Sequence, residues 1–268
     1  MDEVDSTFLC DLARKAGRAI LDVARGGDLG VEYKADESPL TKADRASHEI
    51  IVSALREKTP DIPVISEEDA ESLPVEERLK WKKFWIVDPL DGTKEFIQNR
   101  TDYTVNIALV SDCQPVMGVV YAPVRDWLYF GRADADGAVE AFKQIGEGAR
   151  QPLPLPENAH EGIVAARSRS HPVDSEVDVL ARFNPGRTIS IGSSLKFCLL
   201  AEGLADVYYR ASPTWEWDTA AADAVLRAAG GLVLTPDGQK PLPYNKPSGR
   251  NDDGFFAFAR PELRKILD

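Results

Sequence analysis

Cysteine is scarce in this chain and provides no framework for the fold. The three cysteines, Cys10, Cys113 and Cys198, lie far apart and form no C-x-x-C pair. An odd, scattered set of this kind argues against a disulfide framework and against a thiolate zinc site. We therefore expect three reduced, packed thiols.

Long apolar runs are also missing. No segment approaches the roughly 20 consecutive apolar residues that a membrane-spanning helix needs, so we expect no integral membrane segment. Asp2 and Glu3 stand near the start of the chain, where a signal peptide would be basic. These two features predict a cytoplasmic protein.

Positive charge is in deficit. The chain has 32 lysines and arginines against 44 acids, which gives a formal net charge of −12. This balance argues against nucleic acid as a partner, because binding to nucleic acid depends on a broad basic surface. An acidic protein that handles an anionic small molecule needs local positive charge from metal ions or from a few placed basic side chains.

Several catalytic motifs are absent. The sequence contains no G-x-x-x-x-G-K-[ST] phosphate loop, no G-x-S-x-G and no H-E-x-x-H. Its three histidines are His48, His160 and His171, and no pattern around His171 indicates a Ser–His–Asp triad. Asp88 and Asp91 have the wrong spacing for the aspartyl-phosphate motif D-x-D-x-T.

The chain is organised around residues 84–93. The apolar run 84–87 predicts a buried strand, and Asp88 and Asp91 follow it directly, where a sheet opens to solvent. Thr93 is expected to cap a short helix after them. Two carboxylates this close repel each other unless a cation lies between them, and a divalent metal ion meets that need. The alternative is that both acids are ordinary turn and cap residues.

Two more acids stand at the ends of expected elements. Glu67 follows a short strand at 63–66, and Asp218 opens a helix over 219–229, where a simple N-cap is the alternative role. Oxygen ligands alone select hard cations, with magnesium foremost. Two such ions about 3.5–4 Å apart can clamp the attacking and leaving oxygens of an in-line phosphoryl displacement.

A hydroxyl and a further acid complete this set. Thr93 follows the two aspartates directly, and Asp44 stands at the start of an expected helix that ends near Lys58. Asp44 could accept the proton of Thr93, so that the two groups orient a metal-bound water as the nucleophile. Because a metal ion lowers the pKa of that water, neither group has to be a strong base.

The order of expected helices and strands changes near the middle of the chain. Two amphipathic helices are expected in the first 60 residues, and antiparallel strands between residues 103 and 142. A proline-punctuated segment at 151–156 is the best candidate for a boundary. It divides the chain into halves 1–150 and 151–268, and strands alternate with helices in the second half.

Three motifs resemble the signature of the inositol monophosphatase superfamily, whose members are magnesium-dependent, lithium-inhibited phosphomonoesterases. They are Ser66-Glu67-Glu68, Asp88-Pro89-Leu90-Asp91-Gly92-Thr93 and Trp217-Asp218-Thr219-Ala220-Ala221. The resemblance covers essentially the whole chain in the same order. Within the superfamily the chain is most similar to the CysQ-type 3′(2′),5′-bisphosphate nucleotidases. The residues that carry this are Lys34-x-Asp36-x-Ser38-Pro39-Leu40-Thr41-x-Ala43-Asp44, Lys94-Glu95-Phe96-Ile97, Ser168-Arg169-Ser170-His171 and Gly192-Ser193-Ser194-Leu195-Lys196.

The resemblance implies a mixed α/β (α+β) fold, a five-layer α-β-α-β-α sandwich with the site between its halves. The N-terminal half would contain an antiparallel sheet and most of the metal ligands. The C-terminal half would contain a mixed sheet, Asp218 and the residues that recognise the substrate.

The resemblance also implies roles for individual residues. Glu67, Asp88 and the Leu90 carbonyl would bind one magnesium ion, and Asp88, Asp91 and Asp218 a second. A weaker third ion would lie near Glu67, which is also counted among the catalytic residues with Asp44 and Thr93. The backbone at Gly92 and Thr93 would hold the scissile phosphate, and Leu90, Asp91 and Asp218 would also line its place.

Substrate choice is expected to depend on the second half. Ser193 and Ser194 begin an expected helix over 193–202, where free N–H groups favour an anion, and Lys196 adds positive charge. Arg210 could pair with a second phosphate. The alternative for Lys196 and Arg210 is solvated surface charge. The loop residues Ser170 and His171 are candidates for contacts to the base or ribose, although His171 could equally be an ordinary loop histidine.

The sequence therefore predicts a magnesium-dependent phosphatase that converts 3′-phosphoadenosine 5′-phosphate to AMP, with 3′-phosphoadenosine 5′-phosphosulfate as a possible second substrate. An inositol monophosphatase or fructose-1,6-bisphosphatase with the same machinery is the first alternative. A non-catalytic metal- or nucleotide-binding relative is the second. The expected partner is a small phosphate ester, and the expected state is a monomer or a homodimer.

Overall fold

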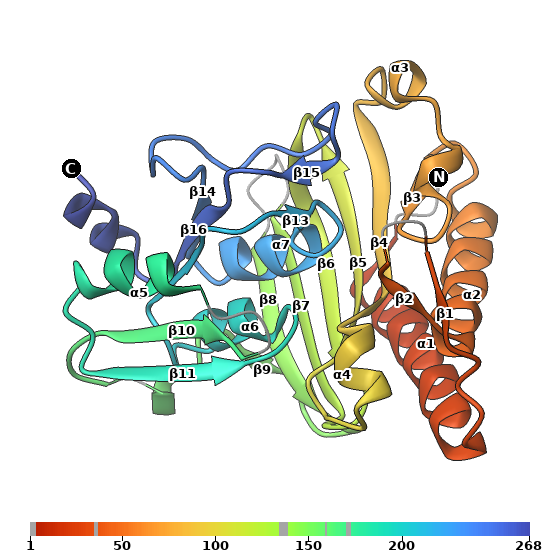
Figure 1. The fold of residues 1–268 in the computed structure, drawn as a ribbon, viewed down its shortest axis with the longest axis horizontal. Helices are drawn as coiled ribbons and strands as arrows, with labels where there is room; N and C mark the ends of the chain where they lie inside the picture. The colour runs from red at the N-terminus through yellow and green to blue at the C-terminus, as the bar shows by residue number, and fades with distance from the viewer. Residues whose placement is uncertain (1–3, 35–36, 134–138, 159, 170–172) are drawn as a thin grey trace.

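Two large β-sheets and three layers of helices form the main body of the described chain (Figure 1). Two further sheets have two strands each: β1 (Glu32–Tyr33) with β2 (Pro39–Leu40), and β13 (Thr214–Trp215) with β15 (Arg250–Asn251). The computed structural model describes residues 4–34, 37–133, 139–158, 160–169 and 173–268. From one side to the other, a helical layer, a seven-stranded sheet, a second helical layer, a five-stranded sheet and a third helical layer follow one another. The predicted five-layer α-β-α-β-α sandwich is confirmed.

The seven-stranded sheet is formed by the first half of the chain and a short edge strand. Its strands, in spatial order, are β3 (Val64–Ser66), β4 (Lys83–Asp91), β5 (Thr104–Ser111), β6 (Gln114–Ala122), β7 (Trp127–Ala133), β8 (Val139–Ile145) and β9 (Gln151–Pro152). All neighbours pair antiparallel except β3 and β4, which run parallel. The predicted antiparallel sheet is thus correct apart from this one pair.

Two long helices, α1 (Ser6–Gly26) and α2 (Lys42–Lys58), cover the outer face of this sheet (Figure 1). Their apolar faces bury side chains such as Ile20 and Ile51 against Val87 and Val105 of the sheet. This is the behaviour expected of amphipathic helices that have a sheet as partner. The short hairpin β1 (Glu32–Tyr33) and β2 (Pro39–Leu40) connects the two helices.

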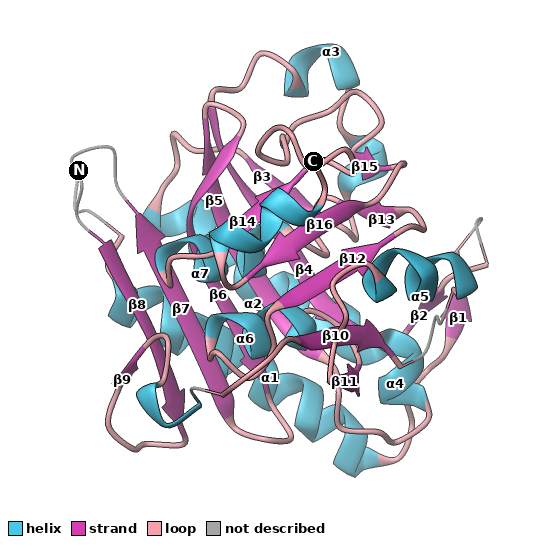
Figure 2. Ribbon diagram, turned by 90° about the vertical axis from the view of Figure 1, so that its left-hand side faces the viewer, coloured by secondary structure: helices cyan, strands magenta, loops and turns pink. Residues whose placement is uncertain are grey.

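The five-stranded sheet is mixed, as predicted for the second half. Its order is β11 (Arg187–Ile191), β10 (Val164–Ser168), β12 (Val207–Arg210), β16 (Phe255–Phe258) and β14 (Leu232–Leu234). Strand β10 pairs parallel with both neighbours, whereas β16 pairs antiparallel with both of its own. Figure 2 shows the strands of the two sheets running in crossing directions. Helix α5 (Asp174–Ala181) and the 3-10 helix η3 (Pro261–Ile266) lie on the outer side (Figures 1 and 2).

The middle layer consists of α6 (Leu195–Ala201) and α7 (Ala220–Ala228), buried between the sheets. Helix α7 packs unusually close to β6 and β7. A Cβ atom at Gly118 would lie 2.4 Å from the Ala221 carbonyl oxygen, and one at Gly131 would lie 2.4 Å from the Val225 Cα. Glycine at both strand positions therefore lets the backbone of α7 touch the sheet.

Core residues from both halves of the chain meet in this middle layer. One buried cluster includes Ile86 and Val120 from the large sheet together with Leu195, Val225 and other residues of the second half. The division into 1–150 and 151–268 remains a prediction. No helix among the described residues has the length and apolar character that crossing a membrane would require.

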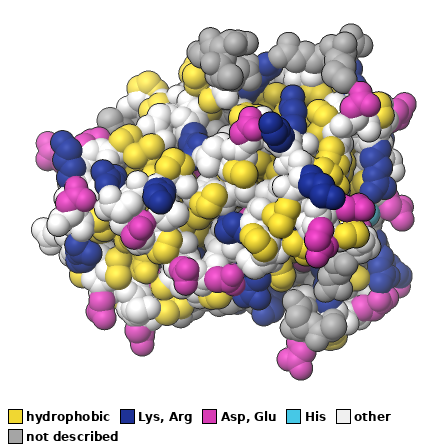
Figure 3. Space-filling model, turned by 90° about the horizontal axis from the view of Figure 1, so that it is seen from above, with side chains coloured by type: hydrophobic (Ala, Val, Ile, Leu, Met, Phe, Trp, Pro, Cys, Tyr) yellow, Lys and Arg dark blue, Asp and Glu magenta, His cyan; other side chains and the backbone are white. Residues whose placement is uncertain are grey.

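Figure 3 shows one face of the molecule, on which basic and acidic side chains are scattered among apolar ones. No continuous basic surface is visible on this face. That pattern agrees with the net charge of −12.

We predict that Gly131→Ala lowers the free energy of unfolding by about 1–3 kcal/mol, the usual range for overpacking a well-packed core. The added methyl group would meet helix backbone, which cannot rotate away as a flexible side chain can. Urea unfolding followed by circular dichroism measures the change. Gly26→Ala is the matched control, because nothing lies within 4 Å of a Cβ at this last residue of α1. Equal stability of Gly131→Ala and wild type would contradict the packing argument.

Candidate metal centre and active site

A cavity of about 1260 Å³ lies between the large sheet and the second half of the chain. Residues from both halves line it. Those predicted from the sequence to act at the site and found in its wall are Glu67, Asp88, Leu90, Asp91, Gly92, Thr93, Ser193, Lys196, Arg210 and Asp218. Ser170 and His171 lie outside the described residues. The predicted ligands therefore share one cleft, although they come from distant parts of the sequence.

An irregularity in β4 puts two of these acids on the same side of the sheet. Asp88 pairs with Asn106 and Asp91 with Thr104, so three steps along β4 match two steps along β5. Side chains alternate between faces of a regular strand, and residues three apart would point in opposite directions. The extra residue of the bulge restores the same direction for both aspartates. The predicted strand at 84–87 was thus too short, because β4 continues through the bulge to Asp91.

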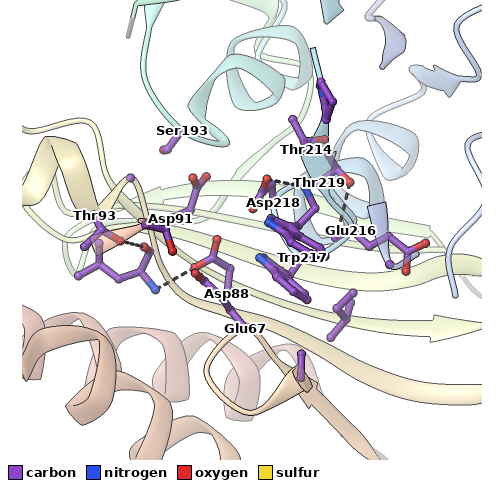
Figure 4. Close-up of a pocket in the computed structure, with 18 of the residues that line it drawn as sticks. Glu67, Asp88, Asp91, Thr93, Ser193, Thr214, Glu216, Trp217, Asp218 and Thr219 are labelled. Atoms are coloured by element: carbon purple, nitrogen blue, oxygen red, sulfur yellow. Dashed lines mark hydrogen bonds between the residues drawn. The ribbon is translucent and has the colours of Figure 1, made fainter. Parts of the chain in front are cut away.

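Asp218 joins the pair from the loop before α7. One carboxylate oxygen from each of Asp88, Asp91 and Asp218 lies within 4.8 Å of the other two. Figure 4 shows these residues and Glu67 around the same part of the pocket. The suggested N-cap role of Asp218 is wrong: Thr219 occupies the N-cap of α7, and Asp218 Oδ2 instead accepts a hydrogen bond from the Trp215 N–H at 2.8 Å.

The three carboxylates repel one another, and the pKa values of two of them show the effect. Asp88 is only 2% exposed, and burial together with the charges of Glu67, Asp91 and Asp218 raises its pKa well above the usual aspartate range. Burial and the charge of Asp91 likewise raise the pKa of Asp218 well above that range. Both shifts have the direction expected for like charges held together in a poorly solvated place.

Polar neighbours hold Asp91 in position. Its Oδ2 accepts hydrogen bonds from the Ser194 N–H at 2.7 Å and the Ser194 hydroxyl at 3.0 Å. Asn106 Nδ2 lies 3.4 Å and Thr104 Oγ1 3.5 Å from the same oxygen. The Ser194 Oγ also lies 2.8 Å from the Asp218 carbonyl oxygen, so the two acceptors share its one proton. The start of α6 is thereby tied to two of the three clustered aspartates.

The conformation before α6 differs from the expected one. The helix begins at Leu195, with Ser194 at its N-cap, and Ser193 has a left-handed φ of 44°. The predicted start at residue 193 was therefore two residues early. The Ser194 N–H donates its hydrogen bond to Asp91 within the protein. Direct contact of Ser193 and Ser194 with substrate stays a prediction.

Glu67 lies against Asp88 at the edge of the cluster (Figure 4). Lys34 from the β1–β2 hairpin contacts it, with 2.8 Å between Nζ and Glu67 Oε1 and 3.1 Å to Glu68 Oε1. Burial raises the pKa of Glu67, and the Lys34 charge opposes that shift. An ammonium group thus neutralises part of the acidic charge at the position where Glu67 was predicted to bind metal.

Thr93 and Asp44 meet as predicted. The Thr93 hydroxyl lies 3.1 Å from Asp44 Oδ1 and 3.2 Å from the Leu90 carbonyl oxygen. Asp44 is the third residue of α2 and forms a capping box, in which its Oδ2 accepts from the Thr41 N–H at 2.7 Å and the Thr41 hydroxyl at 2.5 Å. Burial raises the pKa of Asp44, and the hydrogen bonds from Thr41 and Thr93 oppose the rise.

The expected capping role of Thr93 is wrong. Helix α4 (Thr93–Ile97) begins at Thr93, and its N-cap is Gly92, whose φ of 94° is left-handed. Glycine adopts this conformation without the steric penalty that a side chain would bring. The Thr93 hydroxyl is therefore directed to Asp44 and not to the end of its own helix.

Lys196 and Arg210 are buried, so the alternative of solvated surface charge is wrong. Lys196 is 7% exposed and Arg210 is 8% exposed, and both line the cavity. Lys196 Nζ donates to the Ser193 carbonyl at 2.6 Å. Burial lowers the pKa of Lys196 to about 8, against the opposing charge of Asp91.

Sequence reasoning assigned no role to Lys34, Thr104 or Asn106. Thr104 and Asn106 could have been found, because they are polar residues two apart at the start of strand β5, whose later residues are apolar except the last, and this spacing puts them on one face. Nothing in the spacing connects Lys34 with Glu67, 33 residues later.

Comparison with known proteins decides the family. The model of the inositol monophosphatase family matches residues 1–257. The chain belongs to the inositol monophosphatase family. The resemblance inferred from the three motifs is therefore confirmed.

Members of the family with a curated name resemble the chain over most of its length. It is 45% identical to the 3′(2′),5′-bisphosphate nucleotidase CysQ of Escherichia coli (strain K12) over 249 residues, 92% of this chain and 96% of that protein. It is 34% identical to the CysQ of Haemophilus influenzae over 218 residues, 81% of this chain and 78% of that protein. The crystal structure of CysQ from Bacteroides thetaiotaomicron superposes with a TM-score of 0.82 at 41% identity, covering 95% of this chain and 97% of the other.

The inositol monophosphatase family consists of metal-dependent phosphatases, and the residues of this chain fit a metal ion. Their donors are carboxylate oxygens, the ligands preferred by magnesium and other hard cations. Asp88, Asp91 and Asp218 offer these oxygens within 4.8 Å of one another. The raised pKa values of Asp88 and Asp218 show that positive charge is what this part of the cavity needs.

We predict that Asp218→Asn stabilises the metal-free protein. The folded state raises the pKa of Asp218. Its ionised form therefore destabilises the fold once the pH exceeds the ordinary aspartate pKa, and this effect is complete above the folded pKa. Asparagine keeps an acceptor for the Trp215 N–H without the charge. Near pH 8 with a chelator we expect a melting temperature a few degrees higher, since about 1 kcal/mol corresponds to roughly 2–4 °C.

Added magnesium should reverse the order, because a ligand bound only by the folded state stabilises it, and the wild type has the fuller ligand set. Asp206→Asn is the matched control. This buried carboxylate accepts from the Val164 N–H and pairs with Arg260, so its loss should lower the melting temperature. A metal-free Asp218→Asn protein that melts below the wild type would refute the electrostatic argument.

Proposed function

We propose that the chain is a magnesium-dependent 3′(2′),5′-bisphosphate nucleotidase that removes the 3′-phosphate of 3′-phosphoadenosine 5′-phosphate. One observation carries the proposal: a single cavity contains both a carboxylate cluster and two buried cations, Lys196 and Arg210. A substrate with two phosphates needs two different sites of positive charge. The names of the curated relatives support the same substrate class.

Asp88, Asp91 and Asp218 are the residues that would hold one magnesium ion, and Glu67, Asp88 and the Leu90 carbonyl a second, with a weaker third near Glu67. Bound ions would supply Lewis-acid charge to the phosphate oxygens and lower the pKa of a water molecule. Glu67 would have to exchange its contact with Lys34 for that role.

Thr93 and Asp44 orient the attacking water in this proposal. The Thr93 hydroxyl donates to Asp44 Oδ1, so its oxygen lone pairs face away from that carboxylate and can accept a proton from water. The two hydrogen bonds from Thr41 hold Asp44 fixed. A proton that leaves the water can pass along Thr93 to Asp44, whose raised pKa favours its acceptance.

Lys196 and Arg210 recognise the second phosphate. Both are buried beside Asp91 and Asp218, and all four line the same cavity. Because burial limits how far water can screen them, their attraction for an anion is stronger than that of surface charges. With a pKa of about 8, Lys196 is still largely protonated at neutral pH.

A panel of phosphate esters tests the proposal. Initial rates with magnesium should be far higher on 3′-phosphoadenosine 5′-phosphate than on inositol 1-phosphate or fructose 1,6-bisphosphate. The phosphosulfate analogue should be hydrolysed as well, because its second anionic group occupies the same place. A preference for inositol phosphate would replace the proposed substrate, and a metal-binding protein without activity on any ester would indicate a non-catalytic relative.

We predict that Thr93→Val lowers kcat about 10²–10⁴-fold, the usual contribution of a positioned acid–base group. Valine keeps the shape of threonine but cannot pass a proton, so KM for the nucleotide should change little. Steady-state kinetics at saturating magnesium measure both constants. Thr59→Val is the matched control, because its hydroxyl also lies between a donor and a carbonyl, at Trp85 and Leu55, but far from the cavity. A Thr93→Val protein that keeps more than half of the wild-type kcat would exclude this role.

A further inference from the structure

Asp102 is a buried carboxylate that joins three segments of the chain, and the mechanism above does not use it. It is 0% exposed. Its Oδ1 accepts from Arg125 Nη2 at 2.6 Å, and its Oδ2 accepts from the Gly192 N–H at 3.1 Å and pairs with Arg169 Nη1. Burial alone would raise the pKa of Asp102, but the hydrogen bonds from Arg125 and Gly192 and the charge of Arg169 lower it overall. The group is therefore ionised and tightly held.

The backbone of Asp102 is wedged between two loops of the site. A Cβ at Gly92, in the turn after the clustered aspartates, would lie 3.2 Å from the Asp102 carbonyl oxygen. A Cβ at Gly192 would lie 2.9 Å from the same oxygen and from the Asp102 Cβ. Glycine at both positions lets residue 102 contact the turn on one side and the loop on the other.

Gly192 opens the segment that carries Ser193 and Ser194. Ser193 has a left-handed backbone, which is unfavourable for a residue with a side chain. Its carbonyl accepts from Lys196 Nζ, and the Ser194 N–H donates to Asp91. The position of this segment therefore sets the position of Lys196, one of the two cations proposed to bind the second phosphate.

Arg169 strengthens the connection from the other half of the chain. Its N–H donates to the Ile191 carbonyl at 3.2 Å, and its Nη2 donates to the Ser190 carbonyl at 3.1 Å. Both acceptors immediately precede Gly192. The Asp102 carboxylate thus holds the end of β11 directly through Gly192 and indirectly through Arg169.

We propose that Asp102 is a positioning residue that holds the segment 192–194, with Ser193 in its left-handed conformation, and thereby places Lys196 for recognition of the second phosphate of a nucleoside bisphosphate. The part that concerns the phosphate rests on the proposed function. Asp102 itself does not contact the substrate.

Asp102→Asn tests the inference, because it keeps the shape and one acceptor but removes the charge that pairs with Arg125 and Arg169. We expect KM for 3′-phosphoadenosine 5′-phosphate to rise about tenfold, the scale of one lost charge-assisted interaction. KM for adenosine 3′-monophosphate, which lacks the second phosphate, should change less than about twofold, and kcat should stay within about threefold for both substrates. Equal changes in KM for the two esters, or a fall in kcat alone, would overturn the inference.

A second measurement does not depend on the substrate. In the variant, amide hydrogen exchange of a peptide that covers residues 188–196 should be about tenfold faster than in the wild type, because a local anchor is lost. Unchanged exchange would refute the positioning role. A wild-type protein that is inactive on the bisphosphate, in contrast, would refute the proposed function. The hydrogen-exchange comparison between wild type and Asp102→Asn would then still test whether Asp102 holds the segment 192–194.

Asp206→Asn is the matched control. Asp206 is also a buried carboxylate with a backbone N–H and an arginine as partners, from Val164 and Arg260, but its backbone partner belongs to β10 and not to the segment 192–194. It should lower stability without changing the ratio of the two KM values. If Asp102→Asn does not fold, Arg169→Met, at a side chain that is 42% exposed, should show the same selective rise in KM on a smaller scale. Equal effects of Arg169→Met on the two esters would overturn the inference.

Discussion

Repulsion between Asp88, Asp91 and Asp218 is the constraint on which the rest of the structure depends. An unfolded chain keeps these carboxylates apart, whereas the folded chain brings their oxygens within 4.8 Å in a poorly solvated place. The fold has to overcome this unfavourable energy before any ligand binds. It does so with rigid backbone features: the bulge in β4 fixes Asp88 and Asp91 on one side, and the Trp215 N–H fixes Asp218. The backbone therefore keeps the three carboxylates in place although they repel one another. A cation that binds between them removes this repulsion, and so it can bind firmly.

The packing of the middle layer and the geometry of the site have the same cause. Asp218 belongs to the loop that leads into α7, and α7 reaches the large sheet only because Gly118 and Gly131 leave room for its backbone. A side chain at either glycine would push α7, and the loop before it, away from β4. Close helix–sheet packing therefore does more than fill the core, since it sets the distance between ligands contributed by the two halves of the chain.

The sequence predicted most candidate ligands, because motifs such as Asp88-Pro89-Leu90-Asp91-Gly92-Thr93 fix local chemistry over a few residues. The order of layers was implied by the resemblance of these motifs to the inositol monophosphatase superfamily. It did not predict how β4 continues through its bulge, since a register shift depends on the partner strand β5. Nor could it show that Lys196 and Arg210 are buried, because their burial results from elements that meet only in the tertiary structure. The contact between Thr93 and Asp44, 49 residues earlier, was predicted. The capping role expected for Thr93 was wrong, because the left-handed Gly92 is the N-cap and the helix begins at Thr93 itself.

Charge explains how an acidic protein could select the doubly phosphorylated anion of the proposed function. With a net charge of −12, the surface repels such a substrate, and the carboxylate cluster repels it further unless cations occupy it. In the proposed function, however, the second phosphate faces Lys196 and Arg210, two buried cations that line the cavity whether or not metal is bound. One phosphate position is thus attractive only with metal bound, while the other is attractive at all times. An ester with a single phosphate would use the first position alone, so under the proposed function the fixed pair of cations would separate a bisphosphate from a monoester on this fold.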